Sequence, residues 1–81
     1  MLKFTILYVI WNDAVSFDDW TDITEISTEL AEIHTVGFLV SETQEVLSMA
    51  LNYDKDNEGV SCMINIPKKW IKFRQPISIK P

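Results

Sequence analysis

Apolar and polar residues alternate along most of the chain, and this alternation predicts β-strands. The first strand is expected over residues 3–11, "KFTILYVIW", which are rich in β-branched and aromatic residues. Phe4, Ile6, Tyr8 and Ile10 share one face, and Thr5, Leu7, Val9 and Trp11 share the other. Both faces are apolar from Ile6 onward, whereas a strand in a one-layer antiparallel sheet normally has one wet face. The second face therefore needs a cover, either the segment that follows or another subunit.

The same alternation returns in the second half of the chain. It predicts strands over residues 35–42, 45–54 and 60–66, joined by tight turns at "SET" and "DKDNEG". "PKKW" predicts one tight helical turn, because Pro67 suits the first position of such a turn. Residues 71–79 predict a last strand, which Pro76 confines to a sheet edge or a bulge. Gly37 is expected where the second strand curls or where another backbone passes closely.

Residues 12–33 interrupt the alternation. The stretch "NDAVSFDDWTD" is acidic and irregular, and the next apolar residues follow at steps of three, four and three: Ile23, Ile26, Leu30 and Ile33. This spacing predicts one or two helical turns, beginning near Asp22. Asp22 followed by Glu25 resembles an N-terminal capping pair. β-Branched residues within the segment weaken the helix.

The predicted order is a strand, an acidic excursion with a short helix, three meandering strands, a helical turn and a last strand. This is the order of the small five-stranded antiparallel barrels, Sm-like and Src-homology-3-like. We therefore expect a mainly β fold, with residues 1–81 forming a single small barrel domain and a short helix after strand 1. Because a domain of this size has a thin core, we also expect a homo-oligomer.

Charge and cysteine content narrow the class of protein further. The net charge is −5, which disfavours binding to a phosphate backbone. All acids lie between Asp13 and Glu58, and most bases lie between Lys68 and Lys80. The single cysteine excludes an internal disulfide, and no apolar run approaches the roughly 18 residues that span a bilayer. Asn12 and Asp13 end the first apolar run without a signal-peptide cleavage pattern. These features predict a cytoplasmic protein.

No motif indicates a reaction. His34, the only histidine, has no evident nucleophile, and Glu32 is close in sequence but offers no specific geometry. Cys62 alternates with Val60 and is expected to point into the core. "DKDNEG" resembles the first half of a calcium loop, but Asn65 stands where the loop needs an acid, so a turn is expected. We therefore expect no enzyme, no metal and no cofactor.

Two sets of residues are candidates for binding. The first lies in the acidic excursion, where two tryptophans bracket aspartates: Trp11, Asp13, Asp19 and Trp20. Such a segment suits a peptide or protein partner. The alternative set interleaves cations with a stacking surface, as a nucleotide or single-stranded nucleic acid requires: Lys68, Lys69, Trp70 and Arg74.

Several short motifs resemble those of small, mostly uncharacterised proteins of tailed bacteriophages. They are the Trp-x-Asp of Trp11 and Asp13, the Val-Gly-Phe-Leu run 36–39, and the Ile-Pro-Lys run 66–68. The resemblance implies a phage source and action in the host cytoplasm, and it carries no catalytic residues. We therefore expect a non-enzymatic binding module that interacts with or inhibits a host protein. The alternatives are an oligomeric binder of nucleotides or single-stranded nucleic acid, and a structural or assembly protein of the phage.

Overall fold

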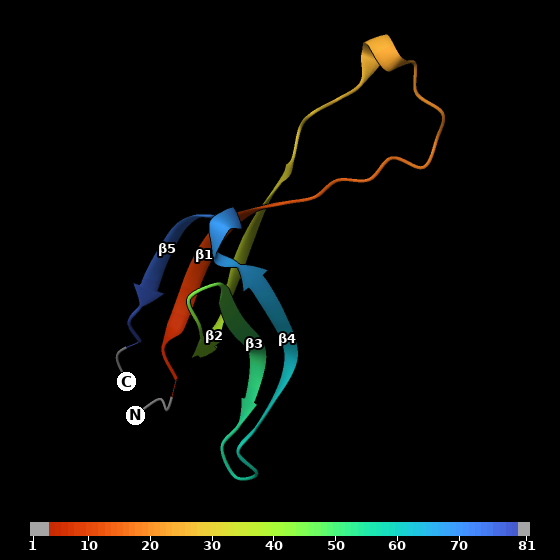
Figure 1. Ribbon diagram of the computed structural model, residues 1–81. Helices are drawn as coiled ribbons and strands as arrows, with labels where there is room; N and C mark the ends of the chain where they lie inside the picture. Colours follow the sequence, from red (N-terminus) through yellow and green to blue (C-terminus); the bar gives the residue numbers. More distant parts are fainter. Residues whose placement is uncertain (1–3, 80–81) are drawn as a thin grey trace.

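The computed structural model describes residues 4–79, whose elements follow the predicted order (Figure 1). The strands are β1 (Ile6–Asp13), β2 (Ala31–Glu42), β3 (Val46–Asp54), β4 (Gly59–Pro67) and β5 (Ile71–Ile77). Two 3-10 turns, η1 (Ile23–Glu25) and η2 (Lys68–Trp70), are the only helical elements of this part of the chain. The mainly β fold and the helical turn after Pro67 are thus confirmed. Lys3, the expected first residue of strand 1, and Lys80, at the end of the basic stretch, lie outside the described range.

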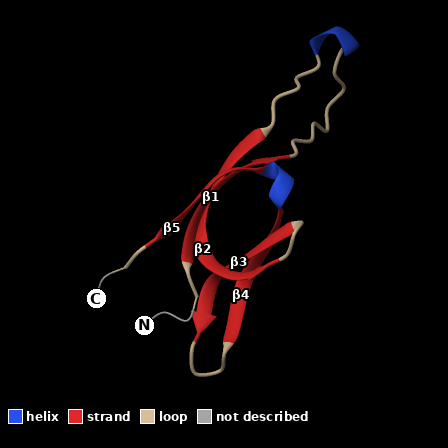
Figure 2. Ribbon diagram, turned by 60° about the vertical axis from the view of Figure 1, so that its left-hand side comes forward, coloured by secondary structure: helices blue, strands red, loops and turns tan. Residues whose placement is uncertain are grey.

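The five strands form one antiparallel sheet in the order β4-β3-β2-β1-β5. Six buried residues from β1, β3 and β4 form one cluster: Leu7, Val9, Trp11, Leu47, Met49 and Ile66. Because β1 is not a neighbour of β3 or β4, the sheet must curl so that their side chains meet. Figure 2 shows this curl, with β5 and β4 at the two ends of the sheet.

Irregularities in the strand pairing bend the sheet. The β1–β5 register shifts between Ile10 and Trp11, and the β2–β3 register shifts between Leu39 and Ser41. Such bulges bend a strand and increase its twist. At Gly37 the backbone of β3 comes so close that an added Cβ would lie 2.7 Å from the carbonyl oxygen of Ala50. The close backbone approach expected at Gly37 is therefore confirmed.

The predicted barrel is wrong in one respect, because the sheet is not closed. β4 and β5 are its two edges, and they are joined through η2 rather than by a hydrogen-bonded ladder. Side chains link the distant parts of the curl instead. Glu42, at the end of β2, accepts two 3.0 Å hydrogen bonds from Arg74 of β5, although β1 separates these strands in the sheet.

The predicted short helix after strand 1 is also wrong. Only the three residues of η1 turn, with the Asp22 carboxylate accepting a 2.9 Å hydrogen bond from the Thr24 amide. The chain is extended again at Ile26, with φ −67° and ψ 127°. A short helix needs an apolar face packed on a neighbour, and Ile23, Ile26 and Leu30 are all exposed. Within residues 4–79, no helix has the length and apolar character needed to cross a membrane.

Candidate functional site

The centre of the candidate site is Trp70, the last residue of η2. Its ring stacks on that of Trp11, with centroids 6.4 Å apart and an angle of 15° between the planes. The two indoles differ in exposure, since Trp11 is 6% exposed and Trp70 is 43% exposed. Trp11 also donates a 3.0 Å hydrogen bond from Nε1 to Thr35 Oγ1. Trp11 therefore supports Trp70 from the core and does not offer its own ring to a partner.

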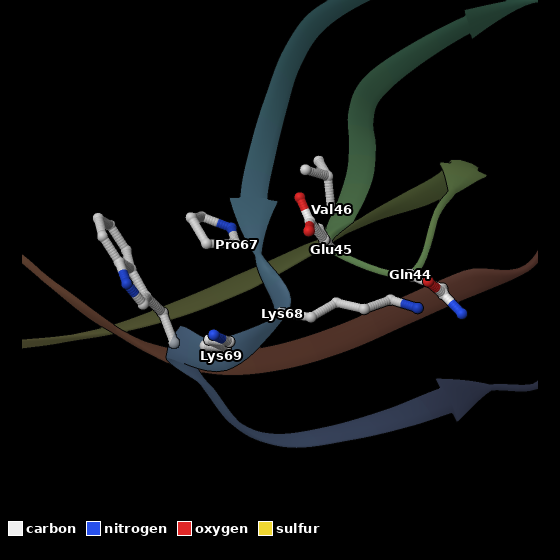
Figure 3. A pocket seen from close by; sticks show the side chains of 7 residues that line it. Gln44, Glu45, Val46, Pro67, Lys68 and Lys69 are labelled. Carbon is white, nitrogen blue, oxygen red and sulfur yellow. The ribbon is translucent and has the colours of Figure 1, made fainter.

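Hollows adjoin Trp70 on two sides. One, of about 330 Å³, lies between η2 and the β2–β3 turn, and Figure 3 shows its lining. Its apolar residues are Val46, Pro67 and Trp70, with Glu45, Lys68 and other polar residues around them. The Lys68 amide donates a 2.8 Å hydrogen bond to the Glu45 carbonyl, which holds the turn and η2 together.

The second hollow, of about 190 Å³, lies where β1 ends and β2 begins. It is lined by Asn12, Asp13, Ala14, Leu30 and Trp70. One Asp13 carboxylate oxygen accepts a 2.8 Å hydrogen bond from the Ala14 amide. Trp70 therefore lines both hollows. The larger one has apolar residues surrounded by charges of both signs, and the smaller one contains the carboxylate of Asp13.

Residues 14–30, which we name the acidic arm, project from the end of the sheet beside the smaller hollow (Figure 1). The molecule measures 54 Å along its longest axis and about half that along the others. The arm carries five acids and no base: Asp18, Asp19, Asp22, Glu25 and Glu29. It also exposes six large apolar side chains: Val15, Phe17, Trp20, Ile23, Ile26 and Leu30.

The structure separates the first predicted set of binding residues. Trp11 lies in the core and Asp13 at the end of β1, whereas Asp19 and the fully exposed Trp20 lie in the acidic arm. Sequence proximity groups Trp11 with Trp20, whereas the structure buries Trp11 together with Leu7 and Val9, which share its face of β1. The prediction missed Trp70 and Leu30 as neighbours of Asp13, because β-pairing brings them together from distant parts of the chain.

The second predicted set is only partly brought together. Lys68, Lys69 and Trp70 line the larger hollow, and Arg74 does not. Lys68 and Arg74 both pair with Glu42, and Arg74 does so through two nitrogens. Hydrogen bonds from Arg74, then from Lys68, lower the pKa of Glu42 from 4.5 to about 2. Two of the three cations in this set are thus already engaged with a carboxylate.

The prediction that Cys62 points into the core is wrong. Cys62 is exposed rather than in the core, and its backbone has a left-handed φ of 56°. That conformation is uncommon for a residue other than glycine. It falls at a position where β3–β4 pairing is interrupted, between the Ala50–Met63 and Asn52–Ser61 pairs. Because the backbone departs from regular strand geometry at this residue, the alternation along β4 does not predict the side on which Cys62 lies.

His34 lies in a chain of hydrogen bonds on exposed strand surface. Tyr8 Oη lies 2.6 Å from His34 Nδ1, and His34 Nε2 lies 2.9 Å from Glu32 Oε2. Glu32 also accepts a 2.8 Å hydrogen bond from Lys72, which is the main reason that its pKa is lowered. The chain ties β1, β2 and β5 together, and neither hollow beside Trp70 includes any of its members.

The segment that resembles half a calcium loop forms a turn, as predicted. Asp54 Oδ1 accepts hydrogen bonds from the amides of Asp56 and Asn57, at 3.0 and 3.4 Å, and Oδ2 accepts one from the Asn57 side chain. These bonds, led by that from the Asn57 side chain, lower the pKa of Asp54. No group of three or more potential metal ligands occurs within residues 4–79.

Comparisons with family models, with curated proteins and with solved structures found no match to this chain.

Proposed function

We propose that the protein is a non-enzymatic binding module for another protein, and that the partner contacts Trp70 and the acidic arm. The observation that carries the proposal is the arm itself, in which six large apolar side chains are exposed on a segment with five acids and no base. Large contiguous apolar patches on a protein surface mark interaction sites. Trp and Phe, like Tyr, also contribute strongly to interface energetics through the large area that they bury.

The charge and shape of the site define the partner. The arm and Asp13 are acidic, so a complementary partner presents basic residues next to apolar ones. The hollows on either side of Trp70 suit side chains of an extended segment that crosses the exposed indole. The resemblance to small phage proteins makes a host protein the expected partner, and the host cytoplasm the expected place of action.

Selection from a peptide-display library tests this proposal, because it samples many partner sequences at once. We expect the full-length protein to enrich peptides that combine Lys or Arg with apolar residues, and salt to weaken their binding. Trp70→Ala and Trp20→Ala should each reduce binding of the enriched peptides. Phe73→Ala is the matched control, because Phe73 is 45% exposed, close to the 43% of Trp70, but lies on another surface. A library without enrichment, or unchanged binding by both tryptophan variants, would contradict the proposal.

A second candidate function is binding of nucleotides or single-stranded nucleic acid. It is favoured by one observation, the presence of Lys68, Lys69 and Trp70 around the same hollow. The engagement of Lys68 by Glu42 weakens it. A ligand at 100 times its Kd stabilises a folded protein by about 2.7 kcal/mol, so mono-, di- and cyclic nucleotides should raise the melting temperature if they bind. A panel that leaves the melting temperature unchanged excludes nucleotide binding.

A further inference from the structure

The surface of β1, β2 and β5 that faces away from the core is mainly apolar, and it also carries His34 and Gln75, which pair with Ile10 and Tyr8. We name it the outer face, and its main residues are Tyr8, Ile10, Val36, Phe38, Phe73 and Ile77. The strand registers place them side by side, since Ile10 pairs with Phe73, Tyr8 with Val36, and Ile6 with both Phe38 and Ile77. Val36 is 53% exposed, and Phe73 and Ile77 are exposed as well.

The acidic arm does not cover this face. It leaves the end of the sheet and points away from it (Figure 1), and its own apolar side chains are exposed. Within residues 4–79, the main contacts between elements join neighbouring strands or join η2 to β1. Two candidates were named as the cover for the second apolar face of the first strand, the segment that follows it and another subunit. The segment that follows is therefore excluded.

We propose that the outer face binds the outer face of a second copy of this chain, as two sheets packed face to face. This inference is independent of the binding function proposed for Trp70. The charge distribution permits a second copy to approach this face. The net charge of −5 arises mainly from the acidic arm and the β3–β4 turn, whereas the charged groups at the edge of the outer face, Glu32 and Lys72, are paired at 2.8 Å. Two copies therefore meet here without bringing like charges together.

The sheet edges are poorer sites for self-association than the outer face. Pro76 lies in edge strand β5 and has no amide hydrogen to donate to a further strand. The other edge strand, β4, is interrupted by the left-handed backbone of Cys62. Both features oppose addition of a strand at an edge. Face-to-face packing needs no backbone donors, because side chains of the two sheets fill the space of about 10 Å between them.

The size of the face predicts a weak dimer. Three strands about 4.8 Å apart, each about six residues long at about 3.4 Å per residue, give a projected area of roughly 300 Å². The aromatic cluster continues through Phe38 to Tyr53, whose rings lie 6.2 Å apart, and this extends the face toward β3. Stable complexes typically bury about 800 Å² on each partner, so the dimer should dissociate on dilution.

Sedimentation equilibrium of the full chain, from low micromolar to millimolar concentration, tests this proposal. We expect the average mass to rise toward twice that of the monomer. Val36→Lys and Phe73→Lys should each abolish the increase, because each places an unpaired cation in a face that the dimer buries. Ile26→Lys is the matched control, since Ile26 is 61% exposed in the acidic arm and the variant should associate like the wild type. Circular dichroism verifies that each variant is folded, and two independent outer-face variants guard against loss of one to misfolding.

Three results would overturn the proposal: a wild type that stays monomeric at millimolar concentration, association unchanged in both outer-face variants, or association lost in Ile26→Lys. Trp70→Ala separates the two proposals, because it should lose peptide binding while dimerising normally. If Trp70→Ala and Trp20→Ala both bind peptides like the wild type but Val36→Lys is monomeric, the proposed function fails and the dimer stands.

Discussion

The close approach of β2 and β3 at Gly37 makes Gly37→Ala a sensitive test of the curled sheet. The new methyl group would lie 2.7 Å from the Ala50 carbonyl oxygen, whereas ordinary contact begins at 3.4 Å, so the strands must separate by about 0.7 Å (3.4 − 2.7). The obstacle is backbone rather than a flexible side chain. Overpacking of this kind costs about 1–3 kcal/mol, and the lower entropy of the unfolded Ala chain offsets about 0.4–1 kcal/mol. We expect a net loss of about 1–2 kcal/mol in the free energy of unfolding.

Thermal unfolding followed by circular dichroism measures this loss. For a domain of this size it corresponds to a decrease of about 5–15 °C in Tm. Gly59→Ala is the control, because Gly59, the other glycine of the chain, has no atom within 4 Å of an added Cβ and no positive φ. It should leave Tm unchanged or raise it by a few degrees. Equal Tm values for the two alanine variants would refute the close approach of β2 and β3.

Three further predictions concern the ion pairs, the core and the acidic arm. The lowered pKa of Glu42 stabilises the fold fully above its unfolded value of about 4.5, and this contribution is lost as the pH falls through about 2. Tm should therefore fall more between about pH 5 and pH 2 in the wild type than in Glu42→Gln, and parallel profiles would exclude this role. Trp11→Ala should cost about 3–5 kcal/mol in urea unfolding, whereas Trp20→Ala should change stability by less than about 0.5 kcal/mol; similar losses would contradict their different burial. Chymotrypsin should cut first after Phe17 and Trp20, as mass spectrometry of a brief digest would detect, and initial cleavage within the strands would show that the arm is protected.

Local patterns in the sequence predicted most of the secondary structure. Strand alternation has a period of two and is set by the backbone of each strand, so it is visible whichever strand lies alongside. The turn at Asp54 and the helical turn after Pro67 also depend on neighbours in sequence. The helical spacing from Ile23 to Ile33 led to the wrong prediction of a short helix. An apolar periodicity stabilises a helix only where the tertiary structure supplies a surface for its apolar face.

The candidate site was less predictable, because its parts come from distant segments. Trp70 reaches Trp11 and Leu30 only after β1 has paired with β2 and β5, and the side chains of Lys68 and Arg74 meet Glu42 only after β2 has bent. Nothing near Cys62 in the sequence indicates its left-handed backbone. The alternation of β1 places Trp11 on the same face as Leu7 and Val9, but only the structure shows that this face is the buried one.

The sequence by itself determined that the chain forms short antiparallel strands, that its acids and bases are segregated, and that its first strand needs a cover on both faces. The tertiary structure decided that the sheet curls without closing, that the acidic arm stands away from it, and that the outer face is left bare. The physical reason is that strand formation depends on neighbouring residues, whereas coverage of a surface depends on which distant segments reach it.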